Sequence, residues 1–214
     1  MRFADRTGAG RGLGAALQHL AGTDPIICGL PRGGVPVAFE VAAALQAPLD
    51  VIVVRKLGFP GQSELAMGAV GEGGARFLDA ATVRLAGLTT AQLSEIEGRA
   101  SATVQRQASA FRDGLDRIER DGRTVVIVDD GLATGSSARA ACQVARVEGA
   151  ARMILAVPVA PRGWISSLEG VADDYLCLIS PQRMRAVGNW YDDFSATTDQ
   201  EVVNCLARAQ EWRH

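Results

Sequence analysis

Apolar residues along the chain fall either into short continuous runs or into positions three and four residues apart. Runs bounded by Gly or Pro and rich in β-branched residues predict buried strands, whereas the wider spacing predicts amphipathic helices. On this basis we expect strands at residues 26–30, 51–54, 124–128, 153–157 and 175–179. Helices are expected at residues 10–20, 35–45, 137–148 and 198–212. The alternation predicts an α/β fold, a parallel sheet of about five strands with flanking helices.

Two stretches interrupt this alternation. Residues 55–76 are rich in Gly and Pro and show no clear period, which predicts a mobile segment at 57–76 with room for a short hairpin near 65–70. Residues 89–121 are polar and Ala-rich with few helix breakers, which predicts an inserted long helix or helical hairpin. An exposed insertion of this kind suits a lid arm or a dimer contact.

Length and composition are those of an ordinary globular protein. The 214 residues are 48% hydrophobic and 21% charged, which is enough to bury the core of one domain. We expect a single domain, 1–214, with its core at 24–180 and a hood at 181–194 that the N- and C-terminal helices join. Because 22 basic residues nearly balance 24 acidic ones and form no stripe, nucleic acid is not an expected partner.

The remaining composition bears on location. No segment approaches the length of a membrane span, and the N-terminus lacks the apolar stretch of a signal peptide, so no membrane partner is expected. The cysteines form no Cys-x-x-Cys pair, which favours reduced thiols and a cytoplasmic protein; they are Cys28, Cys142, Cys177 and Cys205. The two histidines lie near the ends and form no metal-binding pattern.

The most informative segment is 125–137, an apolar run that ends in Asp129 and Asp130 and continues through small residues into a helix. In an α/β sheet this places both carboxylates at the carboxyl edge, where ligand crevices form. Carboxylates accept hydrogen bonds from sugar hydroxyls, and N–H and hydroxyl groups at a helix N-terminus bind phosphate. The segment therefore predicts a ribose 5-phosphate site. A solvated turn would explain a lone Asp-Asp-Gly, but not the whole run.

This run resembles the motif with which the type I phosphoribosyltransferase family binds 5-phosphoribosyl 1-pyrophosphate (PRPP). The resemblance covers roughly residues 24–194 and is strongest to a bacterial subgroup without an established acceptor. It implies that Asp129 and Asp130 hold the ribose hydroxyls and that Ala133 to Ser137 bind the 5′-phosphate. The PRPP-binding residues that the resemblance implies are Asp129, Asp130, Gly131, Ala133, Thr134, Gly135, Ser136 and Ser137. Members that act on 6-oxopurines often have an acid where this chain has Ala133, so the resemblance disfavours that acceptor class.

Two further segments resemble the pyrophosphate-binding parts of the family. A glycine loop follows the first strand, and its small residues let the backbone approach a ligand closely; it comprises Pro31, Arg32, Gly33 and Gly34. Arg55 and Lys56 end the second strand and offer a forked and a compact cation to a polyanion. A tight turn would explain the glycine loop if it stood alone, and a solvated basic pair at a strand end would explain Arg55 and Lys56. A role for Glu64 or Glu72 in the chemistry is left open.

The hood is expected to set the acceptor, a small nitrogenous, nucleobase-like compound. Val187, Trp190 and Tyr191 are the candidate acceptor contacts, and Asp193 is a candidate metal ligand. An alternative of equal weight is that Trp190, Tyr191 and Phe194 only pack the hood onto the sheet.

The resemblance implies transfer of phosphoribose from PRPP, with Mg²⁺ as cofactor and pyrophosphate as the leaving group. The residues expected to act in catalysis orient the sugar and neutralise the departing charge; they are Asp129, Asp130, Arg32 and Lys56. Closure of the 57–76 segment would exclude water. The alternatives are a non-catalytic regulator that senses PRPP or a nucleotide, and an interaction protein with an incidental motif. We also expect a homodimer.

Overall fold

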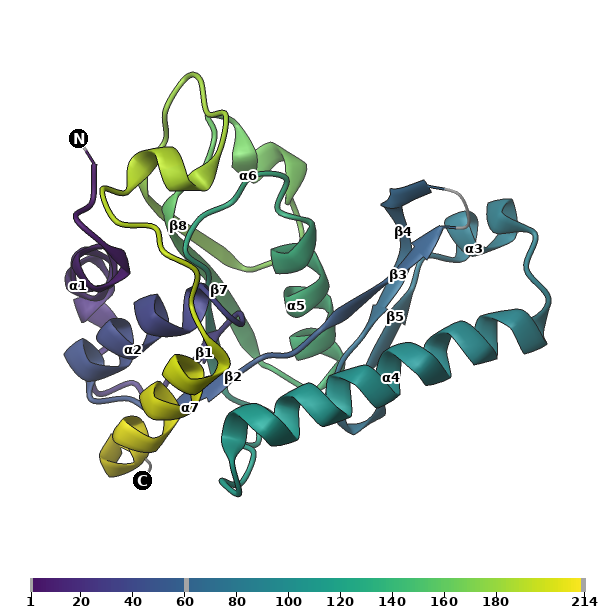
Figure 1. The fold of residues 1–214 in the computed structure, drawn as a ribbon, viewed down its shortest axis with the longest axis horizontal. Coiled ribbons are helices and arrows are strands. Elements are labelled where there is room, and N and C mark those ends of the chain that lie inside the picture. The colour runs from purple at the N-terminus through teal and green to yellow at the C-terminus, as the bar shows by residue number, and fades with distance from the viewer. Residues whose placement is uncertain (1, 60–61, 213–214) are drawn as a thin grey trace.

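The computed structural model describes residues 2–59 and 62–212, without the side chains of residues 62–65. Its centre is a parallel sheet of five strands in the order β2-β1-β6-β7-β8 (Figure 1). These strands are β1 (Ile26–Gly29), β2 (Leu49–Val51), β6 (Thr124–Val128), β7 (Arg152–Val159) and β8 (Asp174–Ile179). The predicted α/β class and five-stranded parallel sheet are confirmed.

Two strand boundaries differ from the prediction. The strand expected at 51–54 pairs with β1 only over Leu49–Val51, because the chain then leaves the ladder toward a second sheet. β7 continues through Pro158, where a stop was predicted. The partner strand β6 has already ended opposite Ala156, so the proline, which has no N–H, interrupts no ladder bond on that side.

Helices cover both faces of this sheet. One face carries α1 (Arg6–Ala16), α2 (Gly34–Leu45) and α7 (Asp199–Arg208), and the other carries α5 (Ser136–Val147) and the short α6 (Trp164–Ser167) (Figure 1). Helix α1 begins four residues before the predicted start because the Asp5 side chain accepts a hydrogen bond from Gly8 N and caps it. Thr198 caps α7 through a capping box with Glu201.

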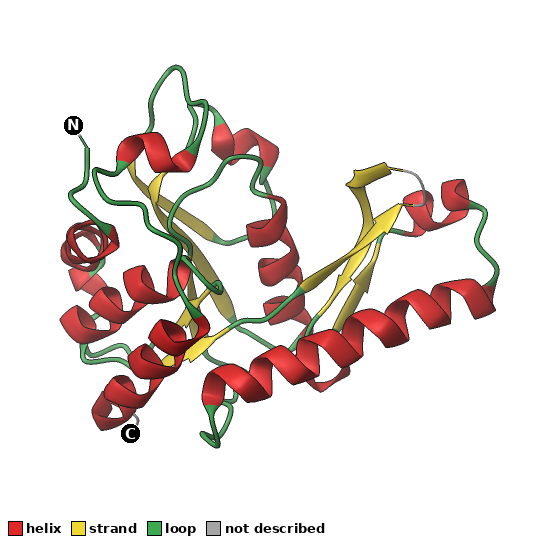
Figure 2. Cartoon of the chain, in the orientation of Figure 1, coloured by secondary structure: helices red, strands yellow, loops and turns green. Residues whose placement is uncertain are grey.

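A second lobe stands beside the core, where the sequence predicted an irregular connection. It is an antiparallel sheet of β3 (Arg55–Phe59), β4 (Gln62–Val70) and β5 (Arg76–Leu78), followed by α3 (Ala80–Ala86) and α4 (Thr90–Arg112) (Figure 2). Glycine suits this sheet because a Cβ on Gly68 would lie 2.1 Å from Phe77 O. The described part of 57–76 therefore contains more regular structure than the predicted short hairpin near 65–70, and the motion of the segment stays a prediction. The insertion 89–121 contains one long helix rather than a helical hairpin.

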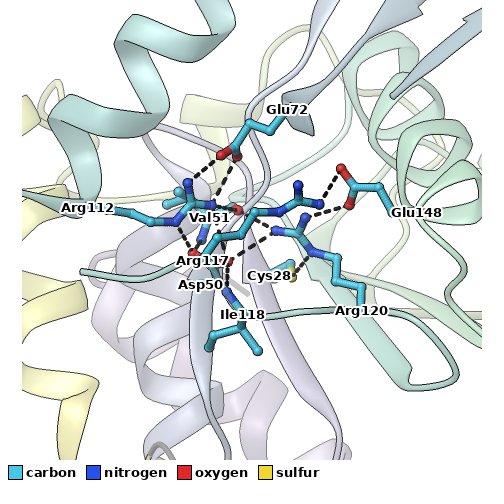
Figure 3. A network of polar contacts seen from close by, with 9 residues as sticks. All are labelled: Cys28, Asp50, Val51, Glu72, Arg112, Arg117, Ile118, Arg120 and Glu148. Carbon is cyan, nitrogen blue, oxygen red and sulfur yellow. Dashed lines mark hydrogen bonds and ion pairs between the residues drawn. The ribbon is translucent and has the colours of Figure 1, made fainter. Parts of the chain in front are cut away.

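A buried network of charged side chains joins the lobe to the core (Figure 3). Asp50, at 0% exposure, accepts hydrogen bonds from Arg112 Nε at 2.8 Å and from Arg120 Nη2 at 3.3 Å. The two arginines reach further acids, Glu72 beside the lobe and Glu148 at the end of α5. Glu148 also pairs with Arg117 at 2.8 Å, so three cations meet three carboxylates. This network fixes the direction in which the lobe leaves the core.

Candidate functional site

The predicted ligand loops meet at the carboxyl edge of the sheet. β1 and β6 are parallel neighbours, with Gly29 opposite Val128. Leu30 N donates to Val128 O at 2.8 Å, so the glycine loop after β1 begins beside the acidic pair after β6. The two loops are therefore neighbours in space although they lie far apart in the sequence.

Glycine is required where these loops touch. A Cβ on Gly33 would lie 2.0 Å from Asp130 Oδ2, and a Cβ on Gly34 would lie 2.6 Å from Val128 O. Any side chain at either position would push the glycine loop away from the acids. The peptide bond between Pro31 and Arg32 is cis. The sequence predicted close approach of this loop to a ligand, and the structure adds close approach to Asp130.

The acidic pair is partly buried and its two members are in different surroundings. Asp129 Oδ1 accepts a hydrogen bond from Asp130 N at 2.9 Å. Burial raises the pKa of Asp129 well above 3.8, and the neighbouring charge of Asp130 adds to the increase. Burial also raises the pKa of Asp130, but Arg6 opposes that increase. The hydrogen bond from Asp130 N and, to a smaller extent, the charge of Arg6 lower the pKa of Asp129 against this increase.

Arg6 is a site residue that the sequence interpretation missed. Its Nε and Nη2 both lie 2.9 Å from Asp130 Oδ2, and the two side chains are only 12% and 14% exposed. Arg6 Nη1 donates to Ser195 O at 2.7 Å, and its guanidinium lies 4.0 Å from the centre of the Phe194 ring. No local motif marks Arg6, because its partner Asp130 lies 124 positions away in the sequence.

The loop that is predicted to bind phosphate, residues 131–137 (the phosphate loop), enters α5 as the sequence predicted. Gly135 adopts a left-handed conformation with φ +71° directly before the helix. Thr134 Oγ1 and Ser136 Oγ lie 3.1 Å apart. Together with Ser137 they border an open cavity of about 180 Å³. This cavity is therefore bordered by hydroxyls, by backbone N–H groups and by the positive end of a 12-residue helix. It has room for a phosphate group, which such groups bind.

The three basic residues predicted to contact pyrophosphate have different surroundings. Lys56, expected at the pyrophosphate, places Nζ 3.0 Å from Ser136 Oγ in the phosphate loop. Arg32 is exposed and pairs with Asp199 at 3.5 Å, whereas Arg55 is exposed and forms no ion pair with any described residue. The structure therefore brings Lys56 to the phosphate loop and leaves Arg32 and Arg55 at the rim.

The inserted helix α4 also reaches the site. A cavity of about 150 Å³ has Asp129 and Ser137 on one side and Gln107 and Phe111 of α4 on the other. Residues outside the segment 125–137 thus line the cavity beside Asp129. Sequence alone did not place α4 in the site, because the buried network that orients it is spread over several distant segments.

In the hood, the predicted acceptor residues have different environments. Tyr191 is 1% exposed, lies 5.5 Å from Phe3 and 4.9 Å from Phe194 between ring centres, and donates to Asp130 O at 2.5 Å. It is therefore packed and not open to a stacking ligand. Trp190 is half-buried, and its carbonyl accepts a hydrogen bond from Phe3 N. Val187 borders the phosphate-loop cavity and remains a candidate acceptor contact.

Asp193, the candidate metal ligand, has local hydrogen-bond partners. Asp193 Oδ1 accepts from Ser195 N at 2.9 Å and from the Ser195 hydroxyl, which forms a local turn. Glu72 is buried in the network with Arg112, and the Glu64 side chain lies outside the described residues. Within residues 2–59 and 62–212, no three His, Cys, Asp or Glu side chains gather as a metal site. Nor does any helix of that part have the length and apolarity to cross a membrane.

Comparison with known proteins agrees with this geometry. The family model for the phosphoribosyl transferase domain matches residues 10–178, and the chain belongs to that family. The crystal structure of TT1426 from Thermus thermophilus is similar, with a TM-score of 0.89 and 42% identity over 97% of this chain and 99% of that chain. Two Mycobacterium tuberculosis proteins, from strains H37Rv and CDC 1551 and provisionally named phosphoribosyl transferases, are each 52% identical over 207 residues. The match covers 97% of this chain and 47% of theirs, so the chain spans about half the length of these relatives.

Proposed function

We propose that this chain transfers the 5-phosphoribosyl group from PRPP to a small nitrogenous acceptor and releases pyrophosphate. The observation that carries the proposal is the meeting of three parts at one sheet edge: the acidic pair, the glycine loop and the hydroxyl-lined phosphate loop. Family membership supports transfer of phosphoribose in general. The donor and the acceptor class are our inference from the chemistry of the side chains.

The reaction breaks the bond between ribose C1 and the pyrophosphate oxygen, and the electron pair leaves on pyrophosphate. The acceptor nitrogen then supplies the pair for the new C1–N bond, and its proton is released to pyrophosphate or solvent. Between these events the ribose carries positive charge, and preorganised carboxylates nearby favour it. Asp129 and Asp130 would accept hydrogen bonds from the ribose hydroxyls and provide that negative field.

The other parts hold the two phosphate ends of the donor. Thr134, Ser136 and Ser137, with the N-terminus of α5, would bind the 5′-phosphate, and Lys56 would neutralise it through its position beside Ser136. The glycine loop would present backbone N–H groups to pyrophosphate, assisted by Arg32 and Arg55. Magnesium would reach the site bound to the phosphate oxygens of the donor. It would supply charge neutralisation on pyrophosphate.

The decisive test is pyrophosphate release from magnesium PRPP across a panel of purines, pyrimidines and simple amines. Mass spectrometry of each acceptor would detect the gain of one phosphoribosyl group. Asp130→Asn should weaken PRPP binding about ten- to hundredfold, as expected for hydrogen bonds to a charged group. The control is Asp174→Asn, because that acid pairs with Arg152 on the surface of β8 and should leave binding unchanged.

The outcomes of this experiment separate the candidate functions. Binding of PRPP with turnover of one acceptor class would support the proposal and identify the substrate. Binding without release for any acceptor would favour a PRPP-sensing regulator instead. If PRPP bound neither with nor without Mg²⁺, the assignment of the ribose 5-phosphate site would be wrong.

Location and assembly complete the proposal. All four cysteines are free thiols, which is typical of a reducing compartment and supports a cytoplasmic protein. We also propose a homodimer. Light scattering at micromolar concentration would test it, and a monomer mass would overturn it.

A further inference from the structure

The acid pair of the ribose site is tied to the beginning of the chain through Arg6. Asp5 caps α1 by accepting from Gly8 N at 2.7 Å, and this fixes Arg6 as the first helical residue. From there the Arg6 guanidinium reaches Asp130 with two nitrogens, each 2.9 Å from Oδ2. Both donors go to the same oxygen, so Oδ1 of Asp130 receives neither of them.

The hood holds the same guanidinium from two other directions. The Phe194 ring centre lies 4.0 Å from its central carbon, and Ser195 O accepts from Nη1 at 2.7 Å. The segment before Arg6 is itself joined to the hood, because Phe3 N donates to Trp190 O at 2.8 Å and Asp192 N donates to Phe3 O at 2.9 Å. A planar, forked and stacked cation fits this arrangement, and a lysine would not reproduce it.

We propose that Arg6 is a positioning residue of the ribose site, which holds Asp130 as a carboxylate and leaves its second oxygen for a ribose hydroxyl. The proposal rests on the proposed binding of PRPP. In this proposal the hood has two roles. It covers the acceptor, and its residues Phe194 and Ser195 hold Arg6 in place. Arg6 itself need not touch the donor.

The charges around Asp130 explain why such a residue is needed. The charge of Asp130 raises the pKa of its neighbour Asp129, and the Tyr191 hydroxyl donates to the carbonyl of Asp130 rather than to its carboxylate. Burial alone raises the pKa of Asp130, and Arg6 is the cation that opposes this. Two adjacent, partly buried carboxylates without a cation would keep a proton between them to a higher pH than isolated carboxylates do. A protonated Asp130 would lose acceptor capacity toward a sugar hydroxyl.

The other charged groups near Arg6 do not replace this function. Local hydrogen bonds lower the pKa of Asp193 and of Glu201, and the positive charge of Arg6 adds a smaller contribution. Both carboxylates therefore have partners of their own, because Asp193 accepts from Ser195 and Glu201 accepts from Thr198. The contact of two Arg6 nitrogens with Asp130 therefore links the N-terminal helix to the acidic pair.

The test compares Arg6→Gln, Arg6→Lys and the control Arg11→Gln over a range of pH. Arg11 lies on the same helix and pairs with Glu40 at 3.1 Å on the exposed side, so its loss should leave PRPP binding unchanged. Removing an opposite charge at this distance typically raises a carboxyl pKa by about one unit or more. In Arg6→Gln the acidic limb of the PRPP-binding curve should therefore move upward by about one pH unit. Arg6→Lys should move it less.

A second measurement does not depend on PRPP. Carbon-13 NMR of aspartate carboxyls, with Asp130 assigned through Asp130→Asn, would follow its titration in the unliganded protein. The midpoint should rise in Arg6→Gln, rise less in Arg6→Lys and stay unchanged in Arg11→Gln. An unchanged midpoint in Arg6→Gln would overturn the proposal, as would tighter PRPP binding, which would show that Arg6 blocks the site. A raised midpoint in a protein that fails to bind PRPP would instead overturn the proposed function alone.

Discussion

Removing the Asp50 carboxylate should destabilise the protein more than removing any surface acid. In Asp50→Asn the shape of the side chain is retained, but Arg112 and Arg120, with side chains 6% and 0% exposed, lose their shared anion. The network then holds three cations against two carboxylates. A charge pair about 4 Å apart contributes roughly 4 kcal/mol at an effective dielectric of about 20. Breaking a buried pair costs about 3–5 kcal/mol, and we expect this range for the free energy of unfolding.

Urea unfolding at pH 7, followed by far-ultraviolet circular dichroism, would measure the difference. The control is Asp24→Asn, because the Asp24 side chain is 71% exposed in its pair with Arg123 and should cost less than about 1 kcal/mol. Glu72→Gln removes one partner of Arg112 but leaves Asp50 in place, so it should fall between the two. If Asp50→Asn unfolded at the same urea concentration as Asp24→Asn, the inferred contribution of the buried ion pairs of Asp50 to stability would be refuted.

Three further predictions concern the ligand loops. Gly33→Ala should weaken PRPP binding at least tenfold in calorimetry, because its Cβ would lie 2.0 Å from Asp130 Oδ2; Gly98→Ala, in open space on α4, is the control and should stabilise the helix by about 0.5–1 kcal/mol. Ser136→Ala should weaken binding about tenfold through loss of one hydrogen bond to phosphate, and unchanged affinity would remove Ser136 from the site. Asp129→Asn should raise the melting temperature of the unliganded protein at pH 7. The folded pKa of Asp129 lies above its ordinary 3.8, so ionisation at higher pH costs the folded state stability. That advantage should shrink as the pH falls toward 3.8, and a lower melting temperature at pH 7 would contradict it.

The parts of the site that could be predicted from sequence are those in which neighbours in the chain are also neighbours in space. Asp129, Gly135 and Ser136 lie in one strand–loop–helix unit, so the order of residue types already implied the geometry. The parallel sheet followed for the same reason, since each buried strand is a short apolar run. The distance between the glycine loop and Asp130 was not available in this way, because it depends on the pairing of β1 with β6.

Long-range partners account for most of what the sequence did not reveal. Arg6 precedes the helix predicted at residues 10–20, and nothing near it in the sequence indicates that it contacts Asp130. The lobe was misjudged because glycine was interpreted as irregularity, whereas Gly68 allows two strands to approach closely. Tyr191 was weighed as a stacking residue because sequence reports its ring but not its burial between Phe3 and Phe194.

The contacts of Arg6 with Phe194 and Ser195 form a clamp between the N-terminal segment and the hood. This clamp has a consequence for how the protein folds during synthesis. Arg6 and Ser195 bond across 189 positions of sequence, so a chain still being synthesised contains the acidic pair and the phosphate loop well before the clamp can close. Contacts of such long separation form late, after much of the core is in place. A ribosome-bound intermediate would therefore have every residue of the recognisable motif and still lack a finished ribose site.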